Sequence, residues 1–429
     1  MSESMKVDPD LKFIDDMAKL GGEEFKRCFQ CATCSGTCPI SPDKDPFPRK
    51  EMIWAVWGLK DKLIKDPDIW LCYQCNDCSI QCPRGGNPGD VLAAARHHAY
   101  QHYAVPGFMG KALANPKALP LLIAAPVVIL LLALGLKTAF DLKMDDGSAF
   151  AFRTSAMVEG KTVAQVNRFT FGYFFPTTML LDPIFIITAA VAVVLFLVGL
   201  GRFWRDIREG ATPARSLGSA AALAIGEIVS HSRFNECDEA KGRYLSHMLT
   251  FYGFLALLVT TALVFVGYYL HHFDIGPPFA QIELPMRLYH PVKILGNAGA
   301  VAFFVGLCIL IYTRATDAAK AGKSNYQDWL LLGLMIGLAV TGILTQLVRL
   351  AGQAAESYGL IGLACGVYFV HLVLVWCMIA YLPYSKFAHL AYRFVAIIHA
   401  KYVGRYDVAA EPAQAASAAG ESQSVAKAG

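Results

Sequence analysis

Two cysteine runs of the same pattern constrain this chain more than any other feature of its sequence. Each run has the spacing C-x2-C-x2-C-x3-C-P, and the runs end at Pro39 and Pro83. Three thiolates at three-residue intervals lie on one tight loop that wraps three corners of an iron–sulfur cube. The proline prevents a helix from continuing back through the site. The spacing therefore predicts [4Fe–4S] clusters.

Where paired runs bind two clusters, the fourth cysteine of each run serves the cluster of the other run. We therefore predict two groups of ligands: Cys28, Cys31, Cys34 and Cys82 for one cluster, and Cys38, Cys72, Cys75 and Cys78 for the other. Zinc sites do not explain a triplet followed by a fourth Cys-Pro. Disulfides need an oxidising compartment, and the N-terminus shows no secretory signal. Four further cysteines are isolated: Cys237, Cys308, Cys365 and Cys377.

The cysteine runs lie in a predicted helical ferredoxin domain, residues 21–105, which follows an amphipathic lead-in, residues 1–20. Apolar residues within 48–64 recur at the period of a helix, and a second helix is predicted from Val91 to about Tyr103. On this second helix we interpret three histidines as surface or junction residues, because each cluster already has four thiolates: His97, His98 and His102.

The rest of the chain has the composition of a membrane protein. Hydrophobic residues make up 55% of the sequence and charged residues 17%, against about 25% charged residues in soluble domains. A soluble protein would have to bury six nearly uncharged helices at once. We expect an all-α chain with a six-span bundle, residues 106–406, and a disordered tail, residues 407–429. The predicted spans are about 119–136, 183–200, 248–270, 292–312, 329–348 and 359–384.

Six spans place both termini on the same side of the membrane. Because the start of the chain lacks a signal peptide, we expect this side to be the cytoplasmic face of the inner membrane. The inner loop 313–328 has three basic residues and the outer loops 271–291 and 349–358 have one each, as the positive-inside rule predicts. The outer loop 138–181 has four and weakens this agreement. The net charge of +4 gives no indication of nucleic-acid binding.

Two histidines near the end of the membrane half are candidates for function, because ionisable residues inside a membrane are costly. His371 lies in the last predicted span, and His389 follows 18 residues later. On a continuous helix this is about 27 Å and about five turns, so both imidazoles would face the same way. Two stacked b haems need this arrangement. The alternative is that each histidine only forms hydrogen bonds within the core and binds no haem. Pro383 is also placed to kink the helix between the two histidines.

Each haem needs a second axial ligand, and the two ligands of one haem must lie at the same depth in the membrane. His247 opens the third span on the inner side and is the predicted partner of His389. On the outer side we predict His290 as the partner of His371. Three histidines remain as alternatives: His271 and His272, which also fit interfacial positions, and His231 for the inner haem.

A quinone site needs an apolar slot near a haem and a polar group that contacts the quinone carbonyl. Lys293 follows His290 by three residues on the same helical face, so we predict a site at the outer ends of spans three, four and six. The alternative is that Lys293 extends to the lipid headgroups. Arg243, four residues before His247, would instead serve a pocket on the cytoplasmic side or pair with a haem propionate.

These residues resemble two known kinds of module. The segment from Cys28 to Cys82 resembles the small iron–sulfur subunit of heterodisulfide reductases, and residues 245–395 resemble the cytochrome b subunits of those enzymes. They also resemble the gamma subunit of respiratory nitrate reductases. That family has haem-ligand histidines 18 apart on its last helix, as at His371 and His389, and ten apart on an earlier helix, where this chain has His247 and then Leu257. The fusion resembles the C subunits of quinone-interacting membrane-bound oxidoreductase complexes of sulfate reducers.

The resemblance implies a membrane bundle of cytochrome b type with two haem b, two [4Fe–4S] clusters and menaquinone as substrate. It also implies cytoplasmic partner subunits with flavin and iron–sulfur centres, and electron delivery toward adenylylsulfate reductase in dissimilatory sulfate reduction. The chain has no flavin or nucleotide motif and no catalytic constellation of its own, so we interpret it as one subunit of a quinone-dependent oxidoreductase. The alternatives are a heterodisulfide-reductase-like complex with another acceptor, and a membrane anchor whose clusters are structural.

Overall fold

The computed structural model describes residues 8–139, 155–158, 161–164, 169–237, 241–277, 280–317 and 322–407. These residues are almost entirely helical, with one antiparallel hairpin of β1 (Ser155–Val158) and β2 (Lys161–Ala164), in which Ser155 pairs with Ala164. The predicted fold class, an N-terminal iron–sulfur domain followed by six apolar helices, is confirmed. The first seven residues of the predicted lead-in and the predicted tail from residue 408 lie outside the described residues.

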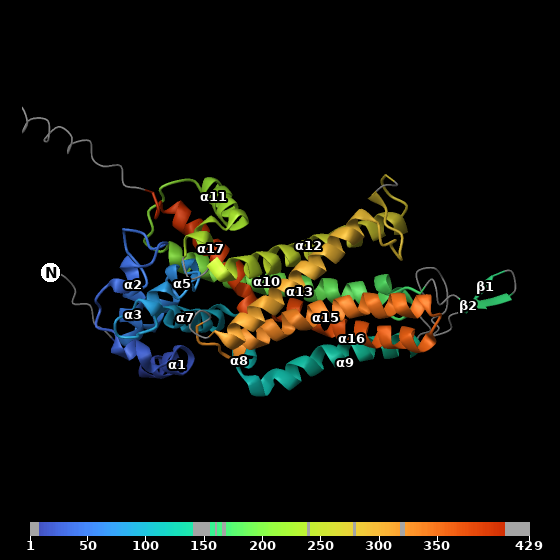
Figure 1. Cartoon of the computed structure of the whole chain (residues 1–429), viewed down its shortest axis with the longest axis horizontal. Coiled ribbons are helices and arrows are strands. Elements are labelled where there is room, and N and C mark those ends of the chain that lie inside the picture. The colour runs from blue at the N-terminus through green and yellow to red at the C-terminus, as the bar shows by residue number, and fades with distance from the viewer. Residues whose placement is uncertain are drawn as a thin grey trace, which may run out of the picture.

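The N-terminal domain is built from short helices that gather at one end of the molecule (Figure 1). They are α1 (Leu11–Gly21), α2 (Thr33–Gly36), α3 (Arg49–Val56), α4 (Lys60–Ile64), α5 (Asp68–Leu71), α6 (Asp77–Ile80) and α7 (Pro88–Tyr103). The single helix expected over residues 48–64 is wrong, because Gly58 between α3 and α4 has a φ of 68° that a helix does not tolerate. In both cysteine runs a left-handed residue, Ala32 or Asn76, precedes a four-residue helix.

Six long apolar helices run away from this domain (Figure 1). In the described part of the chain each is long and apolar enough to cross a membrane. They are α9 (Leu119–Ala139), α10 (Asp182–Arg208), α12 (Lys241–His272), α13 (Pro291–Thr316), α15 (Tyr326–Ala354) and α16 (Tyr358–Tyr381). Shorter helices flank them: α8 (Gly107–Ala114), α11 (Leu217–Ser230) and α17 (His389–Tyr402).

Small residues let α12 and α13 approach closely. A Cβ added at Gly253 would lie 2.5 Å from the backbone nitrogen of Phe303, and one at Gly306 would lie 2.6 Å from the hydroxyl of Thr250. Any larger side chain at these glycines would push the helices apart. Packing through small residues is the usual way in which helices associate in lipid, where burial of apolar surface provides no driving force.

The last predicted span does not continue as one helix to His389. The helix α16 ends at Tyr381, two short 3-10 turns follow, Leu382–Tyr384 and Lys386–Ala388, and α17 begins at His389. Pro383 explains the break, because it has no N–H to donate and its ring clashes with the carbonyl one turn earlier. The expected separation of about 27 Å on a continuous helix and the shared facing of the two histidines therefore do not apply.

A different proline is accommodated inside a span. Pro126 lies within α9 and cannot donate a hydrogen bond to the carbonyl of Leu122. The hydroxyl of Tyr381, at the end of α16, donates to this carbonyl at 2.8 Å. Buried backbone groups in a membrane must be satisfied within the protein, and here a neighbouring helix provides the missing donor.

The iron–sulfur domain and the membrane half share one hydrophobic core. Five aromatic side chains from α5, α7, α10 and α17, each at most 2% exposed, meet where the two halves join: Trp70, Tyr100, Tyr103, Phe203 and Tyr392. The rings of Trp70 and Tyr392 are stacked with their centroids 4.9 Å apart. Outside this core, Lys323 from the segment between α13 and α15 pairs with Glu24 of the iron–sulfur domain at 2.8 Å. Together these contacts fix the cysteine runs against the membrane helices.

Candidate metal and cofactor centres

The eight cysteines of the two runs form two neighbourhoods. The Cys34 thiol lies near Cys28, Cys82 and Cys31, and burial together with these neighbours raises its pKa to about 11. Burial and the neighbouring Cys72 and Cys75 likewise raise the pKa of the Cys38 thiol to about 12, and Cys78 lies near all three of these residues. The structure thus brings the cysteines together in the groups that the exchange of fourth ligands predicts. The ligand assignment itself stays a prediction.

The second group surrounds a small cavity. Four thiols, those of Cys38, Cys72, Cys75 and Cys78, line it together with apolar side chains such as those of Ile40, Phe47 and Leu92. Four thiolates match the donor set of a [4Fe–4S] cluster. The backbone N–H of Gln74 donates to the Cys72 sulfur at 3.2 Å, the kind of contact that sets a cluster's potential. The residues present therefore fit this cofactor.

The two groups differ in exposure. Cys72, Cys75 and Cys78 of the second group are buried, whereas Cys31 of the first group is exposed at the protein surface. The first group therefore reaches the solvent at Cys31, whereas three thiols of the second group are shielded from it.

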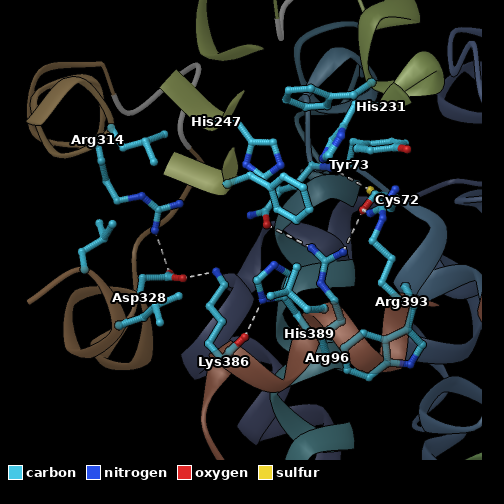
Figure 2. A pocket seen from close by; sticks show the side chains of 18 of the residues that line it. Cys72, Tyr73, Arg96, His231, His247, Arg314, Asp328, Lys386, His389 and Arg393 are labelled. Atoms are coloured by element: carbon cyan, nitrogen blue, oxygen red, sulfur yellow. Dashed lines mark hydrogen bonds and ion pairs between the residues drawn. The ribbon is translucent and has the colours of Figure 1, made fainter. Parts of the chain in front are cut away.

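A larger cavity of about 300 Å³ lies where the iron–sulfur domain meets the membrane helices. Three histidines line it, His231 from the end of α11, His247 from α12 and His389 from the start of α17, and Cys72 of the second cysteine group forms part of its wall. Figure 2 shows His231 and His247 on one side of this histidine pocket and His389 on the other. The predicted inner pair, His247 and His389, is brought together here, with a third histidine beside it.

The imidazole of His389 is held in the form that ligates metals. Its Nδ1 lies 2.7 Å from the carbonyl oxygen of Lys386 (Figure 2). A carbonyl oxygen only accepts, so Nδ1 carries the proton and Nε2 keeps a free lone pair. Desolvation lowers the pKa of His389 to about 4, which keeps the ring neutral. A neutral imidazole whose second nitrogen donates to a carbonyl is the usual state of a histidine that binds a metal.

His231 takes a larger part in the pocket than its sequence position indicates. Its ring centroid lies 5.2 Å from that of His247 and 4.9 Å from that of Phe251. It is buried, and its Nδ1 has no hydrogen-bond partner among the described residues. Sequence reasoning gave His231 only as an alternative ligand because it lies outside the apolar spans. Its position results from the left-handed turn that ends α11.

Two arginines that sequence reasoning missed hold the loop around Cys72. Arg96 of α7 donates to the carbonyls of Ile69 at 2.8 Å and Cys72 at 3.1 Å. Arg393 of α17 donates to the carbonyls of Leu71 and Cys72, each at 3.1 Å. Their spacing in the sequence gives no indication of this role, because both arginines reach the Cys72 carbonyl only after the two halves pack together.

The polar end of the pocket carries more positive than negative charge. Asp328 of α15 pairs with Arg314 of α13 at 3.2 Å and with Lys386, whose side chain also lines the cavity. Two cations therefore face one carboxylate, and the surplus positive charge suits an anionic group such as a haem propionate.

The predicted outer ligands, His371 and His290, stand on different helices, α16 and α13. His371 of α16 has its Nδ1 2.9 Å from the hydroxyl of Thr341. That hydroxyl donates to the carbonyl of Gly337 at 2.6 Å, so it accepts from His371 and leaves Nε2 with a free lone pair. His290 stands at the N-cap of α13, and in the described part of the chain no hydrogen bond or ring contact joins it to His371.

The remaining candidates lie at helix ends. His271 and His272 end α12, and the half-buried Lys293 lies in the first turn of α13. The side chain of Arg243 lies outside the described residues. These quinone and outer-ligand assignments stay predictions.

Comparison with known families defines the class. The family model for a 4Fe-4S dicluster domain matches residues 24–86, which confirms the iron–sulfur part of the prediction. With the fold, this defines an iron–sulfur electron-transfer domain joined to a bundle of six apolar helices. The family model for citrate utilization protein B matches residues 174–411, more than half of the chain. The chain belongs to the citrate utilization protein B family.

Individual relatives match either the iron–sulfur part or both parts. The chain is 39% identical over 104 residues to the C subunit of the H(2):CoB-CoM heterodisulfide,ferredoxin reductase of Methanothermobacter marburgensis, 24% of this chain and 54% of that protein. It is 33% identical over 114 residues to the C iron–sulfur subunit of the CoB–CoM heterodisulfide reductase of Methanopyrus kandleri. This match covers 25% of this chain and 56% of that protein. It is 25% identical over 388 residues to the citrate utilization protein B of Escherichia coli. This match covers 86% of this chain and 88% of that protein.

The chain spans about half the length of the heterodisulfide reductase relatives that it matches. No solved structure matches it.

Proposed function

We propose that this chain is the membrane electron-transfer subunit of a respiratory oxidoreductase complex, linking menaquinol to cytoplasmic partner subunits with flavin and iron–sulfur centres. One observation supports this proposal above the others: Cys72 belongs to the second cysteine group and also lines the histidine pocket. When bound, haem b and the [4Fe–4S] clusters supply one-electron transfer. The names of the heterodisulfide reductase relatives support a place in an oxidoreductase complex.

The chain's own residues would hold a haem in the histidine pocket. His247 and His389 are the proposed axial ligands, and the carbonyl of Lys386 fixes the orientation of the His389 ring. Trp70 and Phe251 line the walls and exclude water. The cations that face Asp328 are the proposed contacts for the propionates.

A second haem is proposed at His371, with His290 as its partner. The hydroxyl of Thr341 supports this role for His371, because it fixes the proton on Nδ1. Leu257 occupies the position where the resembling family has a histidine, so the proposed partner comes instead from the N-cap of α13, where His290 stands. Lys293 is the proposed quinone contact beside this haem.

The partner side is proposed at the first cysteine group. Cys31 is exposed there, so a flavoprotein bound to this surface would lie close to the first cluster. We place this surface in the cytoplasm and the six helices in the inner membrane, and we propose adenylylsulfate reductase in sulfate reduction as the acceptor. The acceptor rests on the resemblance to quinone-interacting membrane-bound oxidoreductase complexes alone.

A second candidate function is supported by the length of one match. The citrate utilization protein B of Escherichia coli aligns with both the iron–sulfur part and the membrane part of this chain. The same electron-transfer unit would then serve a partner in citrate utilisation. Affinity purification of the membrane complex separates the two, because the co-purifying cytoplasmic proteins belong either to sulfate metabolism or to citrate metabolism.

The haem assignment is tested by counting haem per protein in variants purified without oxygen. We expect His389→Ala and His247→Ala each to lose the same haem, and His371→Ala to lose the other. His102→Ala is the matched control, since this histidine lies on α7 and does not line the pocket. Wild-type protein without haem, or an unchanged haem-to-protein ratio in His389→Ala, would contradict the proposal.

A further inference from the structure

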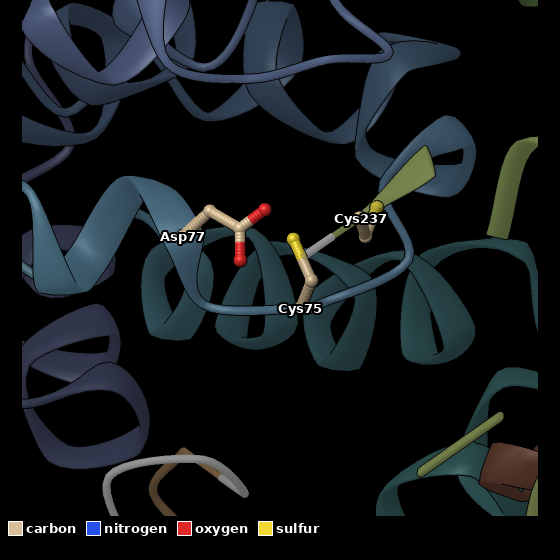
Figure 3. Close-up of side chains that lie close together, drawn as sticks. All are labelled: Cys75, Asp77 and Cys237. Carbon is tan, nitrogen blue, oxygen red and sulfur yellow. The ribbon is translucent and has the colours of Figure 1, made fainter. Parts of the chain in front are cut away.

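Cys237 is a ninth thiol beside the cysteine runs, and it comes from the membrane half of the chain. It follows the short 3-10 helix η6 (Ser232–Glu236) that leads from α11 toward α12, and its side chain is completely buried. Figure 3 shows its sulfur beside that of Cys75, with the carboxylate of Asp77 close by. One ligand atom from each of these three residues lies within 4.8 Å of the others. The cysteine spacing gave no indication of this contact.

The sulfur of Cys237 lies within 4.8 Å of that of Cys75. Cys75 already belongs to a group of four thiols around one cavity, which is the full donor set of a [4Fe–4S] cluster. A fifth thiolate so close would add a further buried negative charge beside the four thiolates, which is costly. The arrangement therefore fits a protonated thiol that donates to the cluster ligand.

The same short segment also reaches the histidine pocket. His231 and Phe234 line the pocket, and Cys237 follows Phe234 by three residues. The ring of Phe234 lies 5.2 Å from that of Tyr73, the residue after Cys72. A seven-residue stretch thus contacts both the pocket and the second cysteine group.

We propose that Cys237 donates an S–H hydrogen bond to the Cys75 sulfur and raises the reduction potential of the second cluster. Reduction adds one electron, and therefore one negative charge, to the cluster and its thiolates, without breaking a bond or moving the thiol proton. A donor to a ligand sulfur stabilises the more negative state. The inference rests on the proposed cluster assignment.

The test is a redox titration with dithionite and ferricyanide, followed by electron paramagnetic resonance, on the whole protein in detergent. We expect Cys237→Ala to keep both clusters and to lower the midpoint potential of one. A tenfold change in the reduction equilibrium corresponds to about 59 mV for one electron. Cys237→Ser, which keeps a donor, should recover part of the shift. Cys377→Ala, a buried cysteine in α16, should leave both potentials unchanged.

Three results would overturn the inference. These are unchanged potentials in Cys237→Ala with both clusters present, an equal shift of both clusters, and loss of the second cluster, which would make Cys237 a ligand or a structural residue. A wild-type protein with no [4Fe–4S] signal would instead contradict the proposed function itself, so the two failures are distinguishable.

Discussion

The hydrogen bond from Tyr381 to the carbonyl of Leu122 provides a quantitative test of how the membrane helices hold together. Tyr381→Phe removes the hydroxyl and keeps the ring. A buried carbonyl left without a donor costs about 1–3 kcal/mol, whereas hydrogen bonds between membrane helices average about 0.6 and reach about 1.7 kcal/mol. Because Pro126 removes the donor of the helix itself, we expect a value near the upper end, about 1.5 kcal/mol. This is roughly a tenfold loss in the folding equilibrium.

The assay is equilibrium unfolding in mixed detergent micelles, followed by tryptophan fluorescence, in a double-mutant cycle with Pro126→Ala. In the Pro126→Ala background the new backbone N–H donates to Leu122, so Tyr381→Phe should cost much less there. We expect a coupling energy of about 1 kcal/mol between the two changes. Tyr358→Phe is the matched control, because this tyrosine begins the same helix and is 55% exposed. Equal costs of Tyr381→Phe in both backgrounds would refute the reasoning.

Three further predictions concern the cofactors and the stability of the iron–sulfur domain. Cys31→Ser and Cys75→Ser should each remove one [4Fe–4S] signal and leave haem absorbance intact; zinc with little iron in protein purified without oxygen would speak against the cluster assignment. Burial raises the pKa of Glu51 well above its ordinary value. Ionisation therefore disfavours the folded state as the pH rises above about 4.3, the pKa in the unfolded chain. In thermal unfolding followed by tryptophan fluorescence, Glu51→Gln should accordingly match the wild type near pH 4 and exceed it at pH 8, and a variant that is less stable at pH 8 would contradict this. For the quinone site, Lys293→Ala should slow haem reduction by a menaquinol analogue; if Arg243→Ala with full haem content slows it instead, the quinol enters from the cytoplasmic side.

The sequence was most informative where the chemistry is local. The spacing within each cysteine run specifies its own loop, and six apolar stretches specify six long helices without any knowledge of their neighbours. Some meetings of distant segments were predictable, such as that of His247 and His389 in the pocket, but other contacts were not. His231 and Cys237 reach the pocket and the second cysteine group only through the turn that follows α11. Arg393 contacts Cys72 because α17, which follows the break at Pro383, packs against α5 of the iron–sulfur domain.

The loop around Cys72 also imposes an order on biosynthesis. Arg96 is made soon after this loop, but Arg393 lies 321 residues beyond Cys72 and follows all six spans. The ribosome therefore releases the second cysteine run long before both arginines can bind the carbonyls of that loop. We expect a nascent chain that stops before α17 to insert its helices and to contain all eight cysteines. The loop around Cys72 would then lack the hydrogen bonds from Arg393. The second cysteine group would then reach its final position only after translation and membrane insertion have finished.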